Sequence, residues 1–121
     1  MSGTLYERLG GKEGIAKIAN DVVDLHLLNP AISVRFKNAK ADVKAMKNGA
    51  ATFLMAGTGG PDLYKGADMR TTHKGMNVSE KEFVEVMADV MKAMDMSNTG
   101  QREKEEVLFV LFSMREEIVA V

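Results

Sequence analysis

Apolar residues recur along most of this chain at spacings of three and four, which places them on one face of an α-helix. Over residues 12–28 this pattern predicts a helix, and Asn29-Pro30 ends it because the residue before proline avoids the α region. Residues 4–9 predict a shorter helix that Gly10-Gly11 terminates. The chain therefore opens with a short helix followed by a long one.

The same spacing continues through the rest of the chain. It predicts helices over residues 41–56 and 101–120 and a short helical turn over residues 68–74. A further helix begins at Ser79, where Ser79 and Glu82 form the pattern of a capping box. The last helix is expected to bury Val107, Leu108, Leu111, Phe112, Met114 and Ile118.

Strands are not expected, because no segment of useful length alternates with a period of two. There are also no repeats, low-complexity tracts or linker-like runs. The pattern predicts an all-α protein of five or six helices, with residues 1–121 forming one domain.

Composition narrows the classes of function. The formal net charge is -1 and no basic block is present, which argues against nucleic acid as a partner. Cysteine is absent, so a disulfide framework, a thiol nucleophile and a thiolate metal site are excluded. The most apolar stretch, residues 107–112, is too short to span a bilayer, and charges interrupt the N-terminal segment. We expect a cytoplasmic protein without a membrane span.

The two histidines are the candidates for metal chemistry. His73 lies on a short segment between glycine-containing loops, with Met69 and Met76 close in sequence, and a neutral imidazole is a good iron ligand. Taken alone, this pattern is more typical of a surface or partly buried histidine that binds nothing. His26 ends the second helix and is better interpreted as a residue favoured by the helix dipole than as a ligand.

Several ordered motifs resemble the group I truncated haemoglobins. They are TLYERLGG at residues 4–11, GGPDLYKG at residues 59–66 and MRTTHK at residues 69–74. The single Phe36 after the Pro30 turn, the Phe53-Leu54 pair and the Ser79-x-x-x-Phe83 pattern also resemble that family. The resemblance covers essentially the whole chain, and the order of the motifs makes it specific.

The resemblance implies a two-over-two helical sandwich around haem b, with His73 as the proximal iron ligand. It also implies that Arg70 or Lys74 reaches a haem propionate, although both are equally well interpreted as solvated charges. The other residues that we expect to contact haem are Phe36, Met46, Ala50, Phe53, Leu54, Met69, Met76, Val78 and Phe83.

The predicted distal side departs from the family pattern. The family usually has a tyrosine on the second helix, where this chain has Val22-Val23, and glutamine at haem-facing positions that correspond here to Met46 and Ala50. These side chains donate no hydrogen bond to bound dioxygen. We therefore predict weak, fast-releasing dioxygen binding and easy oxidation of the iron. We favour Met46 as part of an apolar lining. Its thioether as a sixth iron ligand is the alternative.

The expected function is the binding of small diatomic gases, namely dioxygen, carbon monoxide or nitric oxide, for storage, transport or sensing. A haem enzyme of the nitric oxide dioxygenase or peroxidase type is the alternative, and a haem-free helical interaction module is a third. The dioxygenase needs a long-lived dioxygen complex, and the peroxidase needs a distal acid-base group. The expected partner is a gas ligand, and an electron-donating reductase is a possible second one. We expect the chain to be a monomer or a weak dimer.

Overall fold

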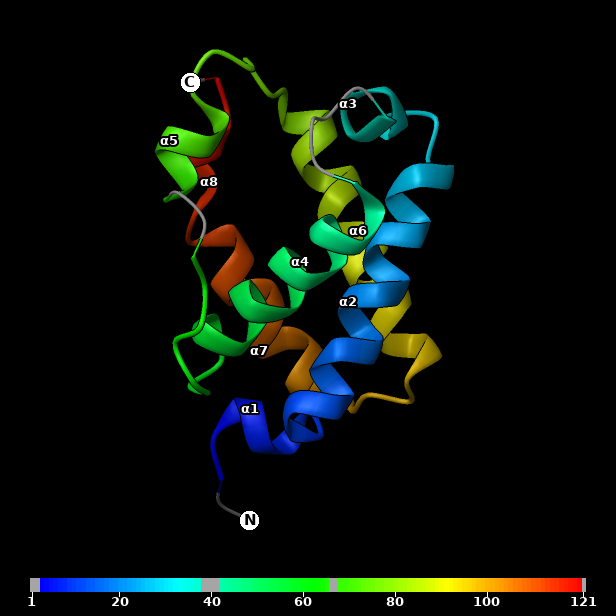
Figure 1. Cartoon of the computed structure of the whole chain (residues 1–121), viewed down its shortest axis with the longest axis vertical. Coiled ribbons are helices and arrows are strands. Elements are labelled where there is room, and N and C mark those ends of the chain that lie inside the picture. Colours follow the sequence, from blue (N-terminus) through cyan, green and yellow to red (C-terminus); the bar gives the residue numbers. More distant parts are fainter. Residues whose placement is uncertain (1–2, 38–41, 66–67, 121) are drawn as a thin grey trace.

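The computed structural model describes residues 3–37, 42–65 and 68–120, and this part of the chain is folded into α-helices (Figure 1). Four long helices form the body: α2 (Gly11–Leu28), α4 (Val43–Gly57), α6 (Glu80–Met96) and α7 (Gln101–Phe112). Four short ones connect or extend them: α1 (Leu5–Arg8), α3 (Ser33–Lys37), α5 (Met69–His73) and α8 (Arg115–Ile118). The only pairing of strand type among the described residues is an isolated bridge between Val78 and Val119. The predicted all-α class is confirmed.

The long helices pack in pairs. Helix α2 contacts α4 along much of its length and also contacts α6, while α7 packs against α6. The buried core between them is made of aliphatic and thioether side chains, as expected for the apolar faces of amphipathic helices. Its buried members are Leu5, Leu9, Ile15, Ile18, Val22, Met55, Val90, Ala93, Met94 and Val107.

Helix starts follow the predicted local signals. The Ser79 hydroxyl accepts from the Glu82 N–H at 3.1 Å, and the Glu82 carboxylate accepts from the Ser79 N–H at 2.9 Å. The capping box predicted for α6 is therefore confirmed, and Thr4 and Glu7 form a second one at α1. Helix α4 is capped by Asp42; the predicted first residue, Ala41, lies outside the described residues.

The loop after α4 lies close to Tyr6, and this close contact explains the glycine at position 60. A Cβ atom on Gly60 would lie 2.3 Å from Cδ1 of Tyr6, a distance that only displacement of the ring could relieve. The Tyr6 N–H also donates to the Thr58 carbonyl oxygen at 2.8 Å. The N-terminal segment is thus locked against this loop, and only glycine fits at position 60.

The prediction of one continuous last helix is wrong. Helix α7 ends at Phe112, and the Ser113 hydroxyl donates to the Val110 carbonyl oxygen at 2.6 Å, in competition with the helical pattern. The chain then turns into α8, which packs against α5 (Figure 1). Leu108 and Phe112, expected to be buried, are 38% and 58% exposed. The sequence prediction also missed the five-residue helix α3.

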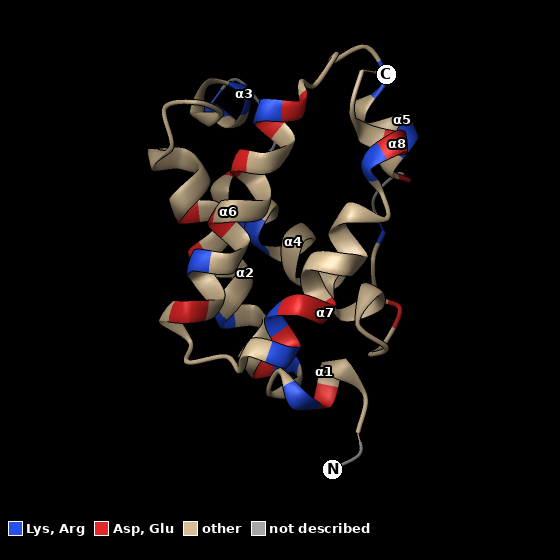
Figure 2. Ribbon diagram, turned by 180° about the vertical axis from the view of Figure 1, so that it is seen from behind, with Lys and Arg blue, Asp and Glu red and all other residues tan. Residues whose placement is uncertain are grey.

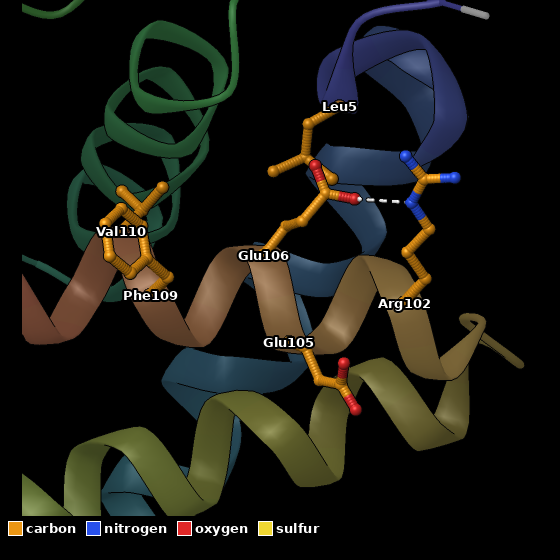
Figure 3. A pocket seen from close by; sticks show the side chains of 6 residues that line it. All are labelled: Leu5, Arg102, Glu105, Glu106, Phe109 and Val110. Atoms are coloured by element: carbon orange, nitrogen blue, oxygen red, sulfur yellow. Dashed lines mark ion pairs between the residues drawn. The ribbon is translucent and has the colours of Figure 1, made fainter.

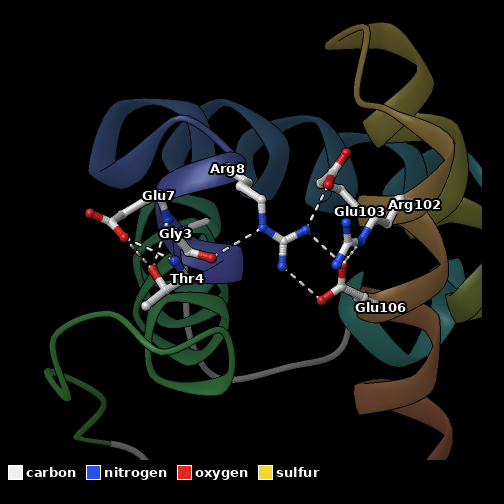
Figure 4. A network of polar contacts seen from close by, with 7 residues as sticks. All are labelled: Gly3, Thr4, Glu7, Arg8, Arg102, Glu103 and Glu106. Atoms are coloured by element: carbon white, nitrogen blue, oxygen red, sulfur yellow. Dashed lines mark hydrogen bonds and ion pairs between the residues drawn. The ribbon is translucent and has the colours of Figure 1, made fainter. Parts of the chain in front are cut away.

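Charged side chains of both signs are interspersed along the helices (Figure 2). One cluster connects the first helix to α7: the Arg8 guanidinium bonds Glu103 at 2.7 Å and Glu106 at 2.6 Å (Figure 4). These bonds raise the pKa of Arg8, and Arg8 lowers the pKa of Glu106. None of the described helices is long and apolar enough to cross a membrane.

Candidate functional site

A cavity of about 400 Å³ lies among α3, α4, α5, α6, α7 and α8. This volume is in the range of small-molecule binding pockets, roughly 300–1,000 Å³. Its wall is mostly aliphatic, aromatic and thioether. The lining residues are Ile32, Arg35, Phe36, Phe53, Met69, Thr72, His73, Met76, Val78, Glu82, Phe83, Val86, Met87, Leu111, Met114 and Ile118.

His73 enters this cavity from the last turn of α5. The Asp68 side chain begins the helix by accepting from the Thr71 N–H at 2.7 Å. Hydrogen bonds from the Thr71 side chain and then from this N–H lower the pKa of Asp68. At the other end, His73 Nδ1 lies 2.8 Å from the Met69 carbonyl oxygen. A carbonyl oxygen can only accept, so Nδ1 carries the proton. The lone pair of the neutral ring is then on Nε2, the form that binds a metal.

The structure brings together seven of the predicted haem-contacting residues. The cavity is lined by Phe36, Phe53, Met69, His73, Met76, Val78 and Phe83. Behind the wall, the Tyr64 ring contacts Phe53 edge-on with 5.7 Å between ring centroids. This contact explains the tyrosine of the loop motif as a support for the aromatic wall.

Five residues predicted for the distal side or for haem contact do not line the cavity. Val22 is part of the main core, and Val23 is 4% exposed. Met46, Ala50 and Leu54 lie on α4, the helix that contributes Phe53, and are half-buried. The haem contact of Met46, Ala50 and Leu54 and the distal placement of Val22 and Val23 stay predictions.

The predicted propionate partners, Arg70 and Lys74, do not line the cavity, and their role stays a prediction. Arg70 is exposed, and its Nη2 lies 3.4 Å from the Glu116 carbonyl oxygen, while Lys74 is exposed and caps α5. Arg35, which the sequence analysis missed, lines the cavity and forms a two-pronged ion pair with Glu82. Its hydrogen bonds, followed by that from the Ser79 N–H, lower the pKa of Glu82 to about 2. The partners are 47 positions apart in the sequence, so no local signal predicts this pair.

His26 also differs from its prediction. It is 5% exposed, and its Nδ1 lies 2.8 Å from Asp89 Oδ2 on α6. Burial lowers the pKa of His26, although Asp89 acts in the opposite direction. A favourable interaction between a charged His26 and the helix dipole is therefore the wrong explanation of its position.

A second hollow, of about 320 Å³, lies between α1 and α7 (Figure 3). Its lining mixes Leu5, Phe109 and Val110 with the charged Arg102, Glu105 and Glu106. An ion pair joins Arg102 and Glu106 along α7, on one wall of this hollow. Without a histidine and with charged walls, it offers no ligand for haem iron.

The comparisons with known proteins agree with this architecture. The family described as bacterial-like globin matches residues 4–120. The group 1 truncated haemoglobin of Tetrahymena thermophila is 30% identical over 98 residues, which are 78% of this chain and 79% of that protein. The one of Tetrahymena pyriformis is 29% identical over 108 residues, 87% of this chain and 88% of that protein. The chain belongs to the group I truncated globins.

The fold of this truncated globin matches a solved relative closely. The truncated haemoglobin of Tetrahymena pyriformis in its Fe(III) form superposes with a TM-score of 0.93 over 98% of this chain and 100% of that one, at 24% identity. A further relative, LI410 of Chlamydomonas moewusii, is 33% identical over 73 residues, and the match spans 42% of that longer protein. The predicted two-over-two fold is confirmed, and membership of the globin family implies a haem-binding protein.

Proposed function

We propose that this truncated globin holds haem b in the cavity, with His73 Nε2 as the proximal iron ligand, and takes small diatomic gases on the other side of the ring. The observation that carries the proposal is the hydrogen bond from His73 Nδ1–H to the Met69 carbonyl oxygen at 2.8 Å. It fixes the ring and its tautomer and so directs an unprotonated nitrogen away from α5.

The rest of the cavity suits a flat apolar cofactor. Phe36, Phe53 and Phe83 supply aromatic faces, and four methionine side chains adapt to an irregular outline. Arg35 is the one lysine or arginine side chain among the described lining residues, so it is the best-placed cation for a propionate. Arg70 and Lys74 remain proposed partners from outside the cavity.

Haem supplies an iron centre that binds dioxygen, carbon monoxide or nitric oxide reversibly. On the distal side we place Val22, Val23, Met46 and Ala50, none of which donates a side-chain hydrogen bond. Dioxygen, the ligand most dependent on such a bond, should leave quickly. Nitric oxide dioxygenation and peroxidation remain alternatives that no contact in the described part of the chain favours.

The decisive experiment is reconstitution of the purified protein with hemin. We expect a Soret band, a deoxy spectrum with dithionite and a shifted band with carbon monoxide. A His73→Gly variant should lose most hemin and regain it with imidazole, while Lys92→Ala, an exposed residue of α6 outside the cavity, should match the parent protein. A His73→Gly spectrum identical to that of the parent would contradict the proposal.

A further inference from the structure

A buried histidine–aspartate pair adjoins the aromatic wall of the cavity. His26 Nδ1 on α2 lies 2.8 Å from Asp89 Oδ2 on α6. The His26 ring stacks on Phe36, with 4.9 Å between centroids and 28° between planes. Phe36 lines the cavity. One chain of contacts therefore connects α6, through the histidine, to the wall of the cavity.

The same aspartate also anchors the turn that leads to Phe36. The Asn29 amide donates to Asp89 Oδ2 at 3.2 Å and to Glu85 Oε1 at 3.0 Å. The Asn29 side-chain oxygen accepts from the Ala31 N–H at 3.0 Å. A single oxygen of Asp89 thus receives two hydrogen bonds, one from the histidine and one from the start of the turn.

Stability alone does not account for this pair. Replacing a buried polar or ionic pair by apolar side chains of similar size is often neutral or stabilising. What a hydrogen bond at Nδ1 adds is direction, because it selects one tautomer and one orientation of the ring. Burial keeps the pKa of His26 below its ordinary value, so the neutral ring donates from Nδ1–H to the Asp89 carboxylate.

Phe36 needs such a support. It lies on α3, a helix of five residues, and helices that short are not stable on their own. Helix α3 packs chiefly against α2, the helix that carries His26. The orientation of the His26 ring therefore determines where the Phe36 ring can lie.

We propose that His26, oriented by Asp89, is a positioning residue that holds the Phe36 ring against bound haem. The inference rests on the proposed function, since it assumes that haem occupies the cavity. An aromatic pair contributes about 0.5–1.5 kcal/mol beyond the area that it buries, which corresponds to roughly a two- to tenfold change in an equilibrium or rate. Loss of the stacked His26–Phe36 pair should therefore loosen the cavity wall without unfolding the protein.

The test replaces the pair by aliphatic residues in the His26→Leu/Asp89→Leu double variant, which removes the ring stacked on Phe36. Its thermal midpoint should equal or exceed that of the parent protein, yet hemin transfer to excess apomyoglobin should be about two to ten times faster. Asp89→Asn keeps an oxygen that accepts from Nδ1–H and should lose hemin at the parental rate. Lys47→Met is the matched control, because it removes another bond of α2, the 2.9 Å ion pair to Asp24, at a residue outside the cavity.

Two results would overturn the proposal: a folded double variant that loses hemin at the parental rate, or an Asp89→Asn variant that loses it as fast as the double variant. If the double variant does not fold, a measurement on the haem-free protein tests the proposal instead. With ring-labelled phenylalanine, the Phe36 signals should shift in Asp89→Ala as the His26 ring turns away, and unchanged signals would also overturn it. If the parent protein takes up no hemin, the proposed function is wrong, and this measurement still tests whether His26 positions the Phe36 ring.

Discussion

An amide donor at position 50 tests whether the distal side of the haem lacks a hydrogen bond to bound dioxygen. Ala50 lies on α4, three residues before the cavity-lining Phe53 and four after Met46, and is half-buried. Ala50 is not a member of the main core. The variant to make is Ala50→Gln.

The expected magnitude follows from the charge on the outer oxygen atom of bound dioxygen. A hydrogen bond to a charged group contributes about 1.5–3 kcal/mol, which is roughly a tenfold to hundredfold change in a rate or affinity. We expect Ala50→Gln to slow dioxygen release by that factor and to change carbon monoxide release by only about twofold, because carbon monoxide carries less charge. Stopped-flow mixing and laser-flash photolysis measure both rates.

Ala50→Leu is the control, since leucine has a similar size and no donor. If leucine and glutamine slow dioxygen release equally, the effect is steric and the hydrogen-bond reasoning is wrong. If the parent protein already releases dioxygen slowly, as a pocket with a tyrosine donor would, the apolar distal side is wrong as well. An unchanged rate in Ala50→Gln would show that position 50 does not face the ligand.

Two further predictions concern stability. Gly60→Ala should lower the free energy of unfolding in urea by about 1–3 kcal/mol, because its Cβ would meet the Tyr6 ring, whereas Gly49→Ala, with no neighbour within 4 Å, should raise it by about 0.5–1 kcal/mol. The pKa of Glu82 falls from 4.5 to about 2 beside Arg35. The ionised Glu82 therefore stabilises the folded protein fully above pH 4.5, and this contribution is lost as the pH falls to about 2. Over that range the stability of the parent protein should fall more steeply than that of Glu82→Gln, and parallel curves would contradict the assignment.

Local interactions explain which parts of the fold the sequence predicted. The start of α6 was predicted because Ser79 and Glu82 are three residues apart and satisfy each other's backbone. The break at Ser113 was missed because neither glycine nor proline marks it. There the packing of α8 against α5 outweighs a helical pattern that continues in the sequence. Helix α3 was missed because five residues hold too little periodicity to be recognised.

The apolar residues of the cavity were largely predictable from the sequence, and its polar residues were not. Its three phenylalanines and two of its four methionines, Met69 and Met76, were placed through the resemblance to a known family. The spacing of Phe83, Val86 and Met87 puts these three on one helical face. Its polar partners were missed, because 47 residues separate Arg35 from Glu82. No periodic pattern reports such a contact.

His26 shows why a correct local rule gives a wrong role. A histidine in the last turn of a helix gains from the helix dipole only while it is charged. Burial penalises the charged form, and here it lowers the pKa of His26 even though Asp89 opposes it. Near neutral pH the ring is therefore uncharged, the dipole contributes little, and what remains is a directed hydrogen bond and a flat face against Phe36. Because the packing of α6 and α3 on α2 creates that burial, only the tertiary structure could reveal the change from an electrostatic to a geometric role.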